Sequence, residues 1–133
     1  MTHEYPQNPT FDSVSISRVM GLGDFGFTRR QREFLVAVMV HAGCFLERQY
    51  CRFTGTARGQ NSREFVARLV TRGFARAIEP GPVRRGRLYH VHHKPLYEAI
   101  GQPDNRHRRL QSVGRMVERV MILDAVLGDR RCW

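Results

Sequence analysis

Residues 60–93 read QNSREFVARLVTRGFARAIEPGPVRRGRLYHVHH, and the spacing of the apolar residues changes partway along this stretch. Its first half carries four apolar residues at the spacing of one helix face: Phe65, Val66, Leu69 and Val70. Gly73 supplies a C-terminal stop for this helix, which we expect over 61–72. Beyond it, 74–78 and 87–93 have the character of strands joined by a turn rich in Pro and Gly. The stretch therefore predicts a helix followed directly by a β-hairpin.

Two further helices are predicted upstream of this stretch. Thr28 and Gln31 have the spacing of a capping box, and the apolar stripe after them favours a helix that ends at Gly43. A shorter helix is expected over 47–54, ended by Gly55. Three short helices followed by a hairpin predict a mainly α fold with a small β-hairpin, of the α+β class.

The remaining residues flank this predicted domain, which spans 28–101 and closes with a short helix at 95–100. Residues 1–27 are rich in turn-forming residues, and we expect them to form an N-terminal arm. Residues 102–133 are expected to contain a long C-terminal helix over 105–127. Its apolar residues follow a near-heptad order: Leu110, Val113, Val117, Val120 and Leu127. This order favours a homodimer through 105–127, and packing of the helix on its own domain is the alternative.

Length and composition limit the class of protein. The chain has 133 residues, enough for one domain with a hydrophobic core. No segment approaches the ~20 apolar residues of a membrane span, and the N-terminus lacks the pattern of a secretory signal. Three cysteines argue against a disulfide scaffold. We therefore expect a cytoplasmic protein without a membrane partner.

The net charge of +10 is concentrated in one part of the chain. Residues 28–94 hold fourteen basic and four acidic residues, a net charge of +10, whereas 1–27 carry −2 and 95–133 carry +2. A basic domain of this kind attracts a polyanion, and nucleic acid is the default candidate. The alternative is a solvated basic surface with no dedicated partner.

The predicted helix over 61–72 and the predicted turn over 79–87 provide the candidate DNA contacts. The polar side of the helix suits the major groove, where Arg reads guanine and Asn or Gln reads adenine. The hairpin tip is expected to contact backbone phosphates or an adjacent minor groove. The candidate DNA-binding residues are Arg58, Gln60, Asn61, Ser62, Arg63, Ala67, Arg68, Arg84, Arg85 and Arg87. On this hypothesis, the partner is double-stranded DNA.

Two short motifs resemble a family of winged helix-turn-helix proteins. Residues 27–31, FTRRQ, are similar to the opening of the first helix in the replication-relaxation family of bacterial mobile elements. Residues 65–74, FVARLVTRGF, are similar to the end of the recognition helix in that family. The resemblance covers roughly 27–101 and implies a winged-helix DNA-binding domain.

No residue cluster indicates catalysis, a cofactor or a metal. His90, His92 and His93 lie close together, but no Cys or His pair at ligand spacing accompanies them. The acidic residues are scattered singly, without the pairing that holds Mg²⁺ in a nuclease, and no phosphate-binding glycine loop is present. The sequence therefore favours a non-enzymatic protein.

Three functions are compatible with these features. The first is a transcriptional regulator that reads duplex DNA. The second is an accessory DNA-binding factor for replication or transfer of a plasmid or integrative element. The third is a protein-interaction module in which the winged helix serves as a scaffold and the long helix binds a partner.

Overall fold

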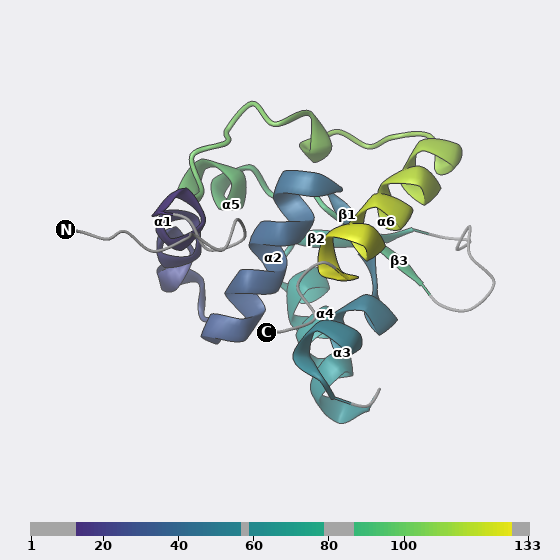
Figure 1. The fold of residues 1–133 in the computed structure, drawn as a ribbon, viewed down its shortest axis with the longest axis horizontal. Coiled ribbons are helices and arrows are strands. Elements are labelled where there is room, and N and C mark those ends of the chain that lie inside the picture. The colour runs from purple at the N-terminus through teal and green to yellow at the C-terminus, as the bar shows by residue number, and fades with distance from the viewer. Residues whose placement is uncertain (1–12, 57–58, 79–86, 129–133) are drawn as a thin grey trace.

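The three helices that the sequence predicts before the β-hairpin are present in the structure, in the expected order (Figure 1). The helices are α2 (Arg29–His41), α3 (Glu47–Thr54) and α4 (Gln60–Thr71), and the strands are β2 (Ala75–Ile78) and β3 (Leu88–Val91). The computed structural model describes residues 13–56, 59–78 and 87–128, so the predicted hairpin tip at 79–86 lies outside the described residues. Helices dominate and are joined by one small antiparallel sheet, which confirms the α+β class.

Local signals place the ends of these helices. The Thr28 hydroxyl accepts a hydrogen bond from Gln31 N at 3.2 Å, and Gln31 Oε1 accepts one from Thr28 N at 2.9 Å. This reciprocal pair is the predicted capping box. Gly43 follows the end of α2 and Gly55 the end of α3, both with positive φ, which an L side chain rarely adopts.

A strand that the sequence analysis does not predict completes the sheet. β1 (Cys44–Leu46) pairs antiparallel with β3, which gives the strand order β1-β3-β2. Three residues are too few to show an alternating pattern, and the pairing comes from β3, more than forty positions along the chain. β2 also pairs antiparallel with β3, as expected for the hairpin.

Both faces of this sheet are covered. Phe45 and Tyr89 are paired across β1 and β3 and belong to the main core, where the Phe45 ring contacts Phe34 of α2 and Phe65 of α4. The opposite face carries a smaller apolar cluster, made by Cys44, Leu46, Leu88, Met116 and Val120. The last two residues belong to α6 (Val113–Gly128), so this helix lies over the outer face of the sheet.

The prediction of a continuous helix from 105 is wrong. Residues 106–108 form a separate 3₁₀ turn, η2 (Arg106–Arg108), and α6 begins only at Val113. The physical reason is tertiary: His107 Nδ1 lies 3.1 Å from the carbonyl oxygen of Met39, and the His107 carbonyl lies 2.9 Å from His90 Nε2. These contacts anchor the turn against α2 and β3 and separate it from α6.

The predicted apolar stripe of the C-terminal helix is also only partly correct. The buried residues of α6 are Met116, Val120, Leu123 and Leu127. They pack within the described domain, which is the alternative to a dimer that the sequence left open. Leu110 and Val113, which the stripe included, are 56% and 52% exposed.

The described part of the predicted arm belongs to the folded domain. α1 (Ser13–Gly21) and the turn η1 (Gly23–Phe25) contribute Val19, Leu22 and Phe27 to the main core, together with the loop that follows. α5 (Lys94–Ala99) closes the hairpin segment near α1, where a Cβ at Gly21 would overlap the carbonyl oxygen of Ala99. Residues 28 and 102 therefore do not separate independent cores among the described residues.

Candidate nucleic-acid interface

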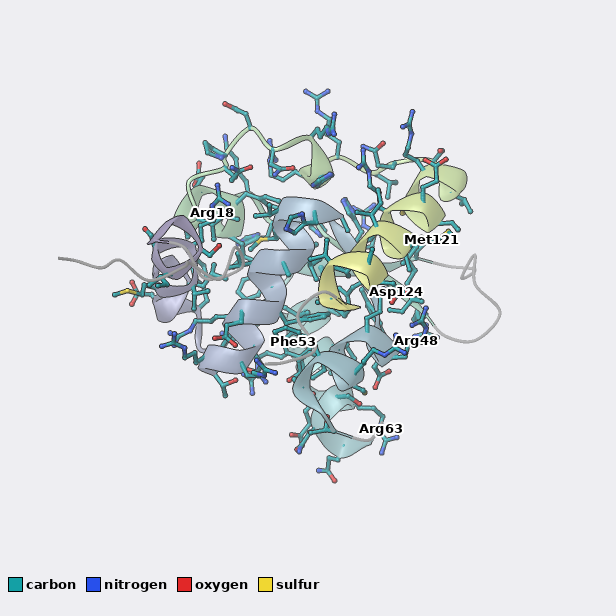
Figure 2. The ribbon with its side chains drawn as sticks, in the orientation of Figure 1. Arg18, Arg48, Phe53, Arg63, Met121 and Asp124 are labelled. Atoms are coloured by element: carbon teal, nitrogen blue, oxygen red, sulfur yellow. The ribbon has the colours of Figure 1, made fainter. Side chains whose placement is uncertain are left out.

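One side of helix α4 (Gln60–Thr71) packs against the core, and the other side is exposed to solvent. Phe65, Val66 and Leu69 are buried, and the Phe65 ring stacks on Tyr50 of α3 with 4.1 Å between centroids. This packing sets the rotation of α4 about its axis. The opposite side of the helix is exposed near its N-terminal end, at the lower edge of the molecule where Arg63 is labelled (Figure 2).

Three of the predicted contact residues are exposed: Asn61, Arg63 and Ala67. Arg63 and Ala67, four positions apart, share the outward face of the helix, and Asn61 lies on a flank of it. The guanidinium of Arg63 has no hydrogen-bond or ion-pair partner among the residues that the structure describes. Gln60 is also exposed, and its amide donates to the Glu64 carboxylate one turn later at 3.0 Å. The group forms a polar surface on the first two turns of α4.

Ser62, which the sequence analysis placed among the DNA contacts, faces the interior instead. Its side chain is fully buried, and its hydroxyl donates to Glu47 Oε2 at 2.6 Å. The Ser62 hydroxyl oxygen also accepts a hydrogen bond from Gly59 N at 3.2 Å. Ser62 therefore joins the start of α4 to the start of α3, and its hydroxyl is not available to a base edge.

Arg68, another of the predicted contact residues, has a partner within the fold. Its Nη1 donates to the carbonyl oxygen of Gly26 at 2.9 Å, and Arg72 Nη1 donates to that of Phe25 at 2.8 Å. Both arginines thus hold the loop after η1 against α4. Their positive charges still contribute to the electrostatic field of this side of the molecule, but Arg68 is half-buried and positions the helix.

Three of the predicted residues, Arg58, Arg84 and Arg85, lie outside the described residues. Arg87 is exposed immediately before β3, at the start of the returning strand of the hairpin. The structure adds Arg52, which is exposed on the neighbouring helix α3 and was not among the predicted contacts. Its helix position carried no signal that separates it from an ordinary solvated charge.

Arg30 shows why the basic block is not uniformly available to a ligand. Its guanidinium lies 4.3 Å from the centre of the Phe53 ring, donates to the Phe53 carbonyl at 2.9 Å and pairs with Glu33 at 3.1 Å. These contacts tie α2 to the end of α3. Part of the arginine excess in 28–94 therefore stabilises the fold.

The side chains that suggested other chemistry are mostly buried. Tyr50, Tyr89 and Tyr97 belong to the core, and the Tyr97 hydroxyl donates to the Val91 carbonyl at 2.7 Å. Burial raises the pKa of Cys44 to about 12, against a smaller opposing effect of Arg119, so this thiol is inert as a nucleophile at neutral pH. Within the described ranges, no group of three His, Cys, Asp or Glu residues is placed to hold a metal ion.

No helix in the described part of the chain combines the length and apolar character needed to cross a bilayer. No family model matches this chain, and neither the curated proteins nor the solved structures contain a match to it. The resemblance of residues 27–31 and 65–74 to the replication-relaxation family therefore stays a prediction.

Proposed function

We propose that the protein is a non-enzymatic, winged-helix binder of duplex DNA that acts as a transcriptional regulator, with α4 lying in the major groove. The observation that carries the proposal is the outward face of α4. It presents Asn61, Arg63 and Ala67 at an edge of the molecule, within the segment that holds the excess positive charge.

The chemistry of this face suits base recognition. A major groove about 12 Å wide admits an α-helix, and the small Ala67 side chain lets the helix axis approach the base pairs closely. Arg63 has the donors for the O6 and N7 atoms of guanine, and Asn61 has the donor and acceptor for adenine. Both side chains lie in the first two turns of α4, the part that enters the groove in helix-turn-helix proteins.

The order of the elements supports the same proposal. α3 and α4 are consecutive helices in contact through Tyr50 and Phe65, and the hairpin of β2 and β3 follows α4 without an intervening element. In a winged helix, this hairpin flanks the recognition helix and contacts the phosphate backbone. The exposure of Arg87 immediately before β3 supports such a contact.

A fluorescence-anisotropy titration tests binding of DNA. We expect the full chain to bind random duplex with an affinity that falls about 10³-fold or more between roughly 50 and 200 mM salt, as six or more phosphate contacts require. An affinity that does not depend on salt would contradict DNA binding and would favour the protein-interaction alternative.

Variants test the role of α4. On a duplex selected from a random library, Arg63→Ala is expected to weaken binding by about 1–3 kcal/mol, and to weaken binding to random duplex less. Arg18→Ala removes the same charge from α1, at the opposite end of the molecule (Figure 2), and should weaken both complexes slightly and equally. If the two substitutions weaken binding to the selected duplex equally, Arg63 does not recognise a base.

A further inference from the structure

A second cationic surface lies away from α4. Five arginines come from η2, from the residue after it and from the first two turns of α6: Arg106, Arg108, Arg109, Arg115 and Arg119. We call them the η2–α6 surface. The segment 104–119 contains only two acidic residues, Asp104 and Glu118, and therefore carries a net charge of +3.

The most exposed members of this surface are not neutralised by the protein. Arg106, Arg109 and Arg115 are exposed, and their guanidinium groups have no hydrogen-bond or ion-pair partner among the described residues. This differs from the basic residues of α2 and α3, where Arg30 pairs with Glu33 and Arg48 pairs with Asp124. Like charges gathered without counterions repel one another, and a polyanion relieves this repulsion.

The backbone that carries these arginines is held in place. Asn105 Oδ1 accepts a hydrogen bond from His107 N at 2.7 Å, and Arg108 Nε donates to the Pro103 carbonyl at 3.1 Å. His107 is buried against α2, as described above. A positive surface on an anchored turn loses less conformational entropy on binding than the same charges on a free chain end.

The η2–α6 surface and the exposed face of α4 lie on opposite sides of the molecule. In Figure 1 the turn η2 and the start of α6 follow the upper edge, whereas α3 and the beginning of α4 form the lower edge, with α2 between them. Arg63 is labelled at that lower edge in Figure 2. A single straight duplex seated against α4 therefore runs along the far side from Arg106 and Arg109.

We propose that the η2–α6 surface binds the phosphate backbone of a second segment of duplex DNA, so that one protein molecule holds two segments together. The proposal rests on the proposed function for the first segment, which α4 holds. The planar guanidinium of arginine matches phosphate oxygens with two parallel hydrogen bonds. Once α4 is bound, other segments of the same DNA are present at high effective concentration, so a surface of modest affinity suffices.

A bridging assay tests the proposal directly. A biotin-labelled duplex on beads is saturated with the full chain, excess protein is washed away, and capture of a second, fluorescent duplex of unrelated sequence is measured. We expect the wild type to capture the second duplex. The combined variant Arg106→Ala, Arg109→Ala and Arg115→Ala should capture it at least about tenfold less, since three phosphate contacts are lost. Its anisotropy titration on a single duplex should stay within about threefold of the wild type at low salt.

A matched variant separates charge from folding. Lysine at the same three positions keeps the positive charges, and this variant should retain most of the capture. Thermal unfolding of both triple variants should match the wild type, because the substituted side chains are exposed. Loss of capture in the lysine variant as large as in the alanine variant would contradict a phosphate-binding role.

The outcomes distinguish this proposal from the proposed function. If the wild type binds one duplex and captures no second, or if the alanine variant captures as well as the wild type, the η2–α6 surface is not a DNA site and α4 keeps its role. If the alanine variant loses all duplex binding and Arg63→Ala loses none, α4 is not the recognition helix and only one DNA surface exists.

Discussion

Ser62 donates its hydroxyl hydrogen to the buried carboxylate of Glu47 over 2.6 Å, and this contact joins the first turns of α3 and α4. Both side chains are polar, and both are buried where the N-terminal ends of α3 and α4 meet. The contact sets the position of the N-terminal end of α4, and therefore of Asn61 and Arg63 beside it. A residue type suited to DNA contact serves here to orient its neighbours.

Replacing Ser62 should cost stability. Ser62→Ala removes a hydrogen bond to a buried carboxylate, and we expect the free energy of unfolding to fall by about 1.5–3 kcal/mol in urea denaturation. Asn61→Ala, on the exposed side of the same turn, should change it by less than about 0.5 kcal/mol. An equal effect of the two substitutions would mean that the Glu47 contact does not support the fold.

Asp124 should make stability depend on pH in the acid range. Burial raises the pKa of this carboxyl, but hydrogen bonds from Arg48 and Gln49 and the charge of Arg48 lower it below its usual value overall (Figure 2). The ionised form is thus favoured in the folded state. Its stabilising contribution is present above the unfolded pKa and is lost as the pH falls through the folded pKa.

Asp124→Asn tests this contribution. Because the Asp124 side chain is 31% exposed, we expect the substitution to lower the free energy of unfolding by about 1 kcal/mol or less at neutral pH. The difference from the wild type should shrink as the pH falls below the unfolded pKa of about 3.9 and vanish below the folded pKa.

The contact between β3 and η2 should weaken in mild acid. Burial is the main reason that the pKa values of His90 and His107 lie below the usual value, and neighbouring positive groups, among them Arg76 and Arg106, lower them further. Below about pH 6.5 the unfolded chain takes up protons that the folded protein does not. Stability therefore falls as the pH drops, by up to about 1.4 kcal/mol per pH unit for each histidine, until the folded pKa is reached.

His90→Gln is the variant that separates this effect from general acid denaturation. Glutamine keeps an N–H donor for the His107 carbonyl but does not titrate. Between about pH 7.5 and 5.5, the variant should lose less stability than the wild type. If His90→Gln leaves the pH dependence of the free energy of unfolding unchanged, His90 does not cause it.

Two glycines should respond in opposite ways to alanine. At Gly21 a Cβ would overlap the backbone carbonyl of Ala99, which cannot move without displacing α5 from α1, so we expect Gly21→Ala to destabilise the fold by about 1–3 kcal/mol. At Gly114, in the first turn of α6, nothing lies within 4 Å of the added atom. Gly114→Ala should raise the melting temperature, because alanine favours the helix by up to about 1 kcal/mol.

The predicted homodimer has a narrower surface available than the sequence indicated. Because one side of α6 packs on its own domain, a dimer through 105–127 uses the apolar residues that remain exposed: Leu110, Val113, Met121 and Ile122. We expect a dimer in sedimentation at about micromolar concentration, and Met121→Glu, at a side chain that is 65% exposed, should shift it to monomer. A wild type that sediments as a monomer would exclude this dimer.

The features of the fold that the sequence predicted correctly depend on interactions between residues close together in the chain. The ends of α2, α3 and α4 depend on a capping box at Thr28 and Gln31 and on glycines at 43, 55 and 73, all within a few positions of the helix that they end. The apolar spacing likewise identified Phe65, Val66 and Leu69 on the buried side of α4, although Val70, predicted with them, is 41% exposed. The change of spacing after Gly73 identified the pairing of β2 with β3. Such signals come from residues that are neighbours along the chain, so they can be recognised without knowing which distant residues they contact.

The features that the sequence did not reveal all depend on residues far apart in the chain. Ser62 faces the interior because its hydroxyl donates to the buried carboxylate of Glu47. Arg68 donates to the carbonyl oxygen of Gly26, 42 positions away. The helix expected from 105 is broken because His107 is held by Met39, 68 positions earlier. No local pattern distinguishes these side chains from exposed ones, because burial of a polar group becomes favourable only when a distant partner completes its hydrogen bonds.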